Sequence, residues 1–127
     1  MKTKIFVTLF ILTLSAMTGY SQSKAKQVKH VVVFKFKADA TTEQVAEVTK
    51  AFKALKSSIP GIVSVENGSN MSTENLNKGF NHVYLLTFEN VASRDAYLPH
   101  PEHKKFGDLL GKLQVVEDVF VVDFVTE

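Results

Sequence analysis

The sequence predicts one α+β domain in which helices pack on one side of a four-stranded antiparallel sheet. Three observations support this prediction. Apolar residues alternate over four segments, as in strands, and recur at helical spacing over other segments. The order of these segments is strand, helix, strand, strand, helix, strand, which is a split βαβ pattern. Ten phenylalanines and a hydrophobic content of 45% supply enough material for one core.

The N-terminal segment has the composition of an export signal. Residues 1–4 are basic, and residues 5–17 form an apolar run of about signal-peptide length. We expect residues 1–21 to be a cleaved signal peptide and residues 22–27 to be a polar tether. The domain then spans residues 28–127. This pattern predicts a periplasmic or secreted protein with no stable membrane insertion after cleavage, and an uncleaved anchor is the alternative.

Charge and cysteine content narrow the functional classes. Without Lys2 and Lys4, the 15 Lys and Arg residues fall to 13, equal to the 13 Asp and Glu residues. A neutral domain lacks the basic patch typical of nucleic-acid-binding proteins, so no nucleic-acid partner is expected. The sequence has no cysteine, so the core or a partner subunit must stabilise the fold without disulfides.

The first predicted strand and helix follow the tether. Val28–Lys37 alternates as a strand, and both of its faces are apolar at the centre. Thr41 and Gln44 form a capping-box pattern that begins a helix. The buried stripe of this helix should consist of its regularly spaced apolar residues, Val45, Val48, Phe52 and Leu55. The break at Ser57–Gly61 ends the helix.

Two further strands are expected in the middle of the domain. Ile62–Glu66 is the first of them, and Asn67-Gly68 should close it. A polar stretch follows, with a single helical turn expected to end at Gly79. Asn81–Phe88 is then a strand with apolar residues on both faces.

The last third of the chain predicts a short helix, a longer helix and a final strand. Val91–Leu98 is the short helix, and Pro101 is well placed to open the longer one. The inward face of the longer helix should carry His103, Phe106, Leu110 and Leu113. Val115–Val125 is the final strand, which is apolar apart from Glu117, Asp118 and Asp123.

This topology predicts a dimer. Right-handed crossovers give the spatial strand order 4-1-3-2 of a ferredoxin-like domain, with the helices on one face. The opposite face is apolar and needs a cover, and a second copy of the chain is the simplest one available. We therefore expect a homodimer whose sheets meet face to face through Val31, Val33, Val83 and Leu85.

The stretch Tyr97–His103 is the predicted centre of any chemistry. Two prolines stiffen it, and imidazoles exchange protons near neutral pH. Because the first strand begins where the third strand ends, His30 should lie close to this stretch. We expect His30, Tyr97 and His103 at the mouth of a small-molecule pocket between sheet and helices. The pocket-lining residues are predicted on the helix-facing side: Val32, Phe52, His82, Tyr84 and Leu86, with His82 toward the other end of the sheet.

Structural roles remain open for each of these residues. The histidines at 30, 82 and 103 are each compatible with a satisfied hydrogen bond inside the fold, and Tyr97 with a core aromatic. His100 is more typical of a loop. A metal site formed by His100, His103 and His30 is a disfavoured alternative. The sequence has no phosphate loop or dinucleotide fingerprint, so no cofactor is expected.

Three motifs resemble the stress-responsive dimeric α/β barrel (Dabb) family: Val28–Lys37, Gly79–His82 and Tyr97–His103. The resemblance extends over essentially the whole mature chain. It implies a ferredoxin-like domain that dimerises through its sheet. One plant branch is similar to polyketide cyclases that close a ring by aldol-type chemistry without a cofactor. The resemblance implies that Tyr97 and His103 would be the proton-transfer pair, with His30 in support and His82 as a further match.

Two functions compete on this basis. The first is an exported homodimer that binds a small hydrophobic or carbonyl-containing molecule. The second is a cofactor-independent lyase or cyclase, in which His103 abstracts a proton alpha to a carbonyl and Tyr97 donates to the oxyanion. In that mechanism His30 would orient or tune His103. A structural dimer with a closed pocket is the least favoured hypothesis.

Overall fold

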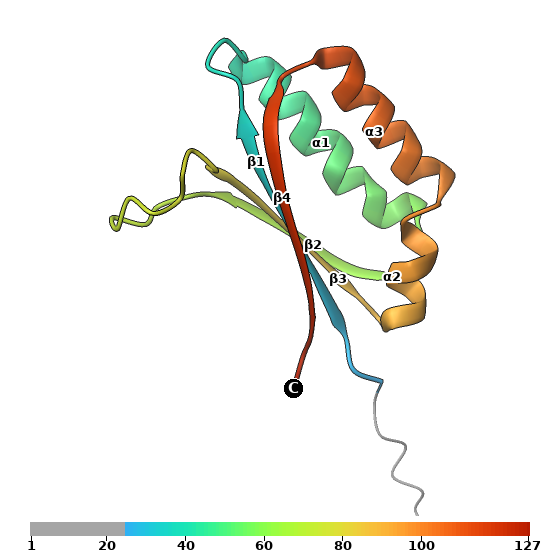
Figure 1. Ribbon diagram of the computed structural model, residues 1–127. Coiled ribbons are helices and arrows are strands. Elements are labelled where there is room, and N and C mark those ends of the chain that lie inside the picture. The colour runs from blue at the N-terminus through green and yellow to red at the C-terminus, as the bar shows by residue number, and fades with distance from the viewer. Residues whose placement is uncertain (1–24) are drawn as a thin grey trace, which may run out of the picture.

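The computed structural model describes residues 25–127, so the predicted signal peptide lies outside the described residues. The chain forms a four-stranded sheet with all helices on one side of it (Figure 1). In chain order the elements are β1 (Val28–Phe36), α1 (Thr42–Ser58), β2 (Ile62–Ser69), β3 (His82–Phe88), α2 (Val91–Tyr97), α3 (Pro101–Leu113) and β4 (Val116–Val125).

The sheet has the order β2-β3-β1-β4, and every neighbouring pair is antiparallel. This confirms the predicted α+β split βαβ topology. Val28 pairs with Phe88, so β1 begins where β3 ends, as expected. The other neighbour of β1 is β4, where Asp123 lies opposite His30. The segment that follows β3 is therefore close to the first residues of β1.

Local capping explains where the helices begin. Thr41 and Gln44 form the predicted capping box, in which the Thr41 hydroxyl accepts from the Gln44 backbone N–H at 3.2 Å. Asn90 caps α2 by accepting from the Ser93 N–H at 2.8 Å. His100 caps α3, where its Nδ1 accepts from the Glu102 N–H at 3.1 Å, and Pro101 occupies the first turn. The prolines around His100 thus position a helix cap.

The core lies between the helix-facing side of the sheet and α1. Phe52 and Val48 from α1 are buried against Tyr84 and Leu86 of β3. The Phe52 and Tyr84 rings are 4.7 Å apart between centroids. The Tyr84 hydroxyl shares a hydrogen bond of 2.6 Å with Thr49 of α1. This bond and the ring contact join the first helix to the centre of the sheet.

Two local expectations were wrong. The strand β2 does not close at Asn67-Gly68 but continues to Ser69, because its ladder with β3 extends to the Ser69–His82 pair. The stretch between β2 and β3 forms turns instead of a helical turn. Asn75, Lys78 and Gly79 adopt positive φ values there, which a right-handed helix does not allow.

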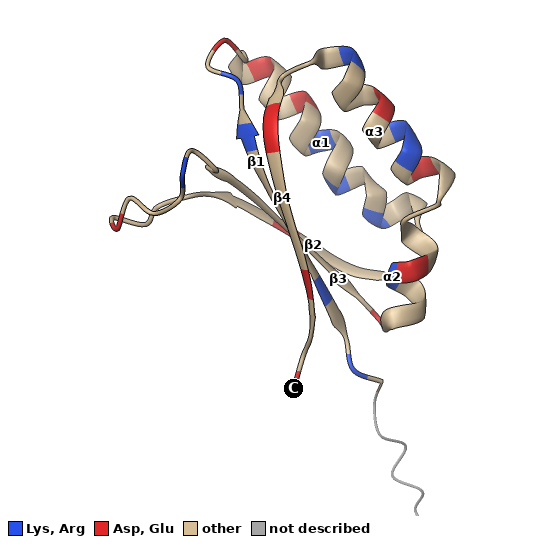
Figure 2. Cartoon of the chain, in the orientation of Figure 1, with Lys and Arg blue, Asp and Glu red and all other residues tan. Residues whose placement is uncertain are grey.

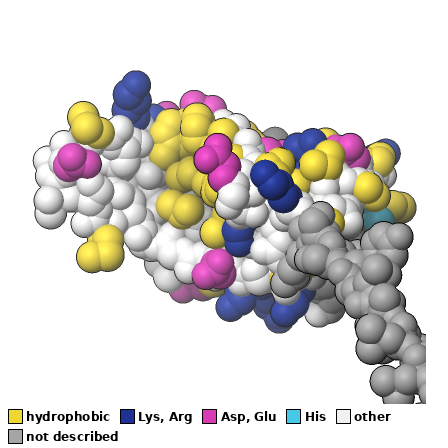
Figure 3. Space-filling view, turned by 90° about the horizontal axis from the view of Figure 1, so that it is seen from below, with side chains coloured by type: hydrophobic (Ala, Val, Ile, Leu, Met, Phe, Trp, Pro, Cys, Tyr) yellow, Lys and Arg dark blue, Asp and Glu magenta, His cyan; other side chains and the backbone are white. Residues whose placement is uncertain are grey.

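The sheet face that the helices leave open is rich in apolar side chains. Val31, Val33, Val83 and Leu85 are partly buried on this face, and Phe120, Val122 and Phe124 of β4 are exposed. Figure 3 shows hydrophobic side chains gathered in one area of the surface seen from below. The outer sheet face is the name used below for the face that carries Val31, Val33, Val83, Leu85, Phe120, Val122 and Phe124.

Positions of Lys or Arg and of Asp or Glu both occur along α1 and α3 (Figure 2). Within residues 25–127, no helix combines the length and the apolar character needed to cross a membrane.

Candidate functional site

A cavity of about 260 Å³ lies between the sheet and the helices α1, α2 and α3. Its wall is mainly apolar, with Val32 and Val121 from the sheet and Phe52 and Phe106 from the helices. Three polar residues complete the wall, His30, Tyr97 and His103. The cavity therefore combines an apolar body with a small polar end, which is typical of small-molecule sites.

The structure brings His30, Tyr97 and His103 together. The rings of Tyr97 and His103 are 4.3 Å apart between centroids, and those of His30 and Tyr97 are 5.5 Å apart. His30 and Tyr97 are buried, whereas His103 is half-buried. No ring contact or hydrogen bond joins His30 to His103 within the described residues. Tyr97 contacts both imidazoles and lies between them.

His103 has a defined tautomer in its neutral form. Its Nδ1 lies 3.0 Å from the carbonyl oxygen of Leu98, which can only accept a hydrogen bond. Nδ1 therefore carries the proton, and Nε2 retains a lone pair. His103 lies in the first turn of α3, and the proline-flanked cap at His100 fixes the start of that helix. An imidazole arranged in this way can accept a proton from a bound molecule.

Tyr97 is a phenol that stays protonated. Burial first, and the negative charge of Asp123 second, raise the pKa of Tyr97 well above its usual range. No hydrogen-bond partner of its hydroxyl is found among the described residues, yet no fully buried side-chain oxygen or nitrogen there lacks a partner. Tyr97 is one of the residues that line the cavity, so a ligand bound there lies beside this side chain. Tyr97 can donate a hydrogen bond to a ligand.

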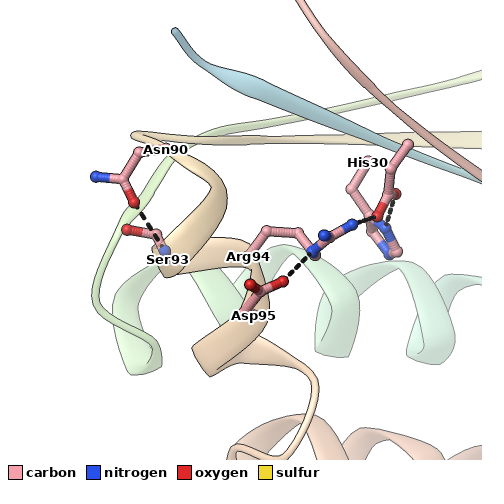
Figure 4. Close-up of polar contacts among 6 residues, drawn as sticks. His30, Asn90, Ser93, Arg94 and Asp95 are labelled. Carbon is pink, nitrogen blue, oxygen red and sulfur yellow. Dashed lines mark hydrogen bonds and ion pairs between the residues drawn. The ribbon is translucent and has the colours of Figure 1, made fainter. Parts of the chain in front are cut away.

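His30 is held by a carboxylate that sequence reasoning did not select. His30 Nδ1 lies 2.6 Å from Asp123 Oδ1, and Arg94 contacts the other carboxylate oxygen (Figure 4). Arg94 also donates through Nε to Asp95 at 2.9 Å. The available signals were an acidic residue inside an apolar strand and an arginine three residues before Tyr97, on the same face of α2.

The other predicted pocket residues occupy different places. Val32 and Phe52 line the cavity as expected. Tyr84 and Leu86 point to the same side of the sheet but are not on the cavity wall, because Phe52 and α1 pack over them. His82 pairs with Phe34 at the far end of β3, and its ring lies 4.8 Å from Phe36. Burial lowers the pKa of His82.

Several wall residues were not among the predicted pocket residues: Phe34, Leu98, Phe106, Gly107, Leu110, Val119 and Val121. The helical spacing of Phe106 and Leu110 with His103 was the available signal for the α3 members. The predicted strand order already placed β4 beside β1, but Val119 and Val121 could be located only from the register of that pair, which brings them opposite Phe34 and Val32.

Three histidines each have Nδ1 engaged by a different group of the protein. His30 Nδ1 faces Asp123, His100 Nδ1 caps α3 and His103 Nδ1 faces the Leu98 carbonyl. Across residues 25–127, no group of three or more His, Asp or Glu side chains is arranged to hold a metal ion.

Comparison with known proteins gives a consistent result. A family model described as "Stress responsive A/B Barrel Domain" matches residues 28–126. Olivetolic acid cyclase of Cannabis sativa is 37% identical over 82 residues, which is 65% of this chain and 81% of the cyclase. A crystal structure of an Arabidopsis thaliana protein superimposes with a TM-score of 0.73 at 30% identity, covering 79% of this chain and 95% of that one.

A dimeric Bacteroides fragilis protein with a ferredoxin-like fold is also similar. It superimposes with a TM-score of 0.60 at 31% identity, covering 79% of this chain and 96% of the other.

Proposed function

This chain belongs to the stress responsive A/B barrel domain family, and we propose that it is an exported homodimer that binds a small, mainly apolar carbonyl compound. The cavity at Tyr97 and His103 is the observation that carries this proposal. Its volume of about 260 Å³ lies below the range of roughly 300–1,000 Å³ for drug-sized ligands. The ligand should therefore be small.

The polar end of the cavity explains the choice of a carbonyl compound. The protonated Tyr97 hydroxyl is a donor without a partner among the described residues, and a carbonyl oxygen is an acceptor of matching chemistry. Phe52, Phe106 and Leu110 surround the remaining volume and favour an alkyl or aromatic group. A ligand with one carbonyl and a short apolar chain satisfies both ends.

Binding can be tested with 2-hexanone as the probe, titrated into the ¹⁵N-labelled protein and followed by NMR. Amide signals around Tyr97 and His103 should shift, whereas those of Val83 on the outer sheet face should not. Tyr97→Phe should weaken binding about fivefold, because a hydrogen bond contributes about 1 kcal/mol. Tyr84→Phe is the matched control, since Tyr84 is equally buried but does not line the cavity. Equal affinities in wild type and Tyr97→Phe would contradict the carbonyl assignment.

A second candidate function is proton-transfer catalysis without a cofactor, favoured by the tautomer of His103. His103 Nε2 would take the proton alpha to the carbonyl, while the Tyr97 hydroxyl donates to the enolate oxygen. In a cyclase the enolate carbon then attacks a second carbonyl of the same molecule, and the new alkoxide receives the proton from His103. Similarity to a protein named olivetolic acid cyclase supports a ring-closing reaction of this class.

Exchange of the alpha protons of 2-hexanone in D₂O separates catalysis from binding. Exchange should be faster than in buffer, and His103→Gln should lower the catalysed rate by roughly 10²–10⁴-fold while leaving the affinity nearly unchanged. His82→Gln is the control, because His82 lies at the far end of β3. An unchanged exchange rate in His103→Gln would exclude His103 as the base, and a wild type that does not accelerate exchange would leave binding alone.

The homodimer would cover the outer sheet face. Exposed apolar side chains on β4, including Phe120, Val122 and Phe124, support this proposal, as does the dimeric Bacteroides fragilis relative. Export would follow from residues 1–21, with cleavage after Ser21. N-terminal sequencing of protein recovered outside the cytoplasm should begin at Gln22, and an intact Met1 there would contradict cleavage.

A further inference from the structure

Arg94 lies at the outer end of a chain of contacts that leads to the cavity. The two carboxylate oxygens of Asp123 contact different residues: Oδ1 lies 2.6 Å from His30 Nδ1, and Oδ2 contacts Arg94. Arg94 in turn reaches Asp95 at 2.9 Å, as the dashed lines of Figure 4 show. The His30 side chain is 7% exposed, whereas those of Asp123 and Arg94 are 23% and 24% exposed. The contacts thus run from the interior to the surface.

The carboxylate determines which nitrogen of His30 carries a proton. A carboxylate only accepts hydrogen bonds, so His30 Nδ1 donates to Asp123. No partner of His30 Nε2 is found among the described residues, and no fully buried nitrogen or oxygen there lacks a partner. His30 is one of the residues that line the cavity, which leaves Nε2 as the ring nitrogen available to it. In the neutral ring this nitrogen is an acceptor.

Arg94 is well anchored to hold Asp123 in place. The Asn90 cap fixes the start of α2, and Gly61 allows that helix to approach β2 closely. A Cβ atom at Gly61 would lie 2.6 Å from the Ser93 side chain. Arg94 and Tyr97 are three residues apart on this helix and face the same way. Arg94 and Asp123 also line a surface hollow that is separate from the cavity.

We propose that Arg94 is a positioning residue which holds Asp123 so that His30 keeps its proton on Nδ1 and presents Nε2 to the cavity as an acceptor. Without Arg94 the carboxylate loses one of its two fixed contacts, and the ring is no longer restricted to one protonation pattern. The consequence for ligands rests on the proposed function. A cavity with the Tyr97 donor and the His30 acceptor should prefer a carbonyl compound that also carries a hydroxyl group.

The tautomer can be measured without any ligand. In ¹⁵N-labelled protein at pH 8, long-range ¹H–¹⁵N spectra distinguish protonated from unprotonated ring nitrogens. Wild type should show His30 with Nε2 unprotonated. Arg94→Met should show a proton on Nε2 in a measurable fraction of molecules. Asp123→Asn should show it as well, because the amide N–H can donate to Nδ1.

Asp95→Asn is the matched control, because it removes the charge of the exposed partner of Arg94 and leaves the contact with Asp123. It should preserve the wild-type spectrum of His30. If Arg94→Met unfolds the protein, Arg94→Gln provides the same test with a smaller change in packing. An Arg94 variant with an unchanged His30 spectrum, or an equal change in Asp95→Asn, would overturn the proposal.

A second experiment, with ligands, distinguishes failure of this proposal from failure of the proposed function. Wild type should bind 1-hydroxy-2-hexanone about fivefold more tightly than 2-hexanone, and Arg94→Met should lose this preference. Failure of both ketones to bind, with the His30 spectrum changed as expected, would refute the proposed function and leave Arg94 as a positioning residue. Binding without a preference in wild type would refute the hydroxyl-bearing ligand class.

Discussion

Two tyrosines with the same burial should differ in how much stability the protein loses when the hydroxyl group is removed. Tyr97 and Tyr84 are both 1% exposed. The Tyr84 hydroxyl shares a 2.6 Å hydrogen bond with Thr49, whereas Tyr97 lines the cavity and its hydroxyl has no partner found among the described residues. Tyr84→Phe should lower the free energy of unfolding by about 1 kcal/mol, which is the net contribution of such a bond. Tyr97→Phe should change it by less than about 0.5 kcal/mol.

Chemical denaturation of both variants measures this difference, and thermal unfolding provides a second readout. A loss of about 1 kcal/mol corresponds to roughly 4–8 °C in Tm for a domain of this size. The aromatic rings remain in both variants, so packing against Phe52 or His103 is preserved. If Tyr97→Phe is destabilised as much as Tyr84→Phe, the Tyr97 hydroxyl has a structural partner and is not available to a ligand.

Three further predictions concern pH, backbone geometry and assembly. The pKa of Tyr97 is raised above its unfolded value of 10.0. Its contribution to the free energy of unfolding should therefore be complete below pH 10 and decrease as the pH rises further. In alkaline denaturation, Tyr97→Phe should lose less stability above pH 10 than the wild type does. Gly61→Ala should lower the free energy of unfolding by more than about 1 kcal/mol in denaturant melts, because φ of Gly61 is +87° and an added Cβ would lie too close to Ser93. Gly68→Ala is the control and should lower it far less, because the space around Gly68 is open. Val122→Lys on the outer sheet face should convert a dimer to a monomer in light scattering at equal concentration, and Lys50→Glu on the exposed side of α1 should not; a monomeric wild type would contradict the proposed interface.

The order of elements and the helix caps were predictable because they depend on local signals. Alternating apolar residues marked β1 and β3, and the Thr41 capping box marked α1. The position of His30 beside Tyr97 was also predictable, since topology places the start of β1 at the end of β3. Turn geometry between β2 and β3 was missed, because single positive φ values at Asn75 and Lys78 leave little trace in the sequence.

The sequence by itself determined the fold class, because the period of apolar residues and the order of segments leave few right-handed topologies. It also singled out His30, Tyr97 and His103 as polar groups at one end of the sheet. Tertiary structure alone decided which groups touch these residues. Asp123 meets His30 across 93 positions of sequence because the register of β4 against β1 places the two residues opposite each other, and Arg94 of α2 contacts the other carboxylate oxygen of Asp123. Hydrogen bonds act over about 3 Å, so pairing register and helix placement select the partners, and composition and spacing do not encode them directly.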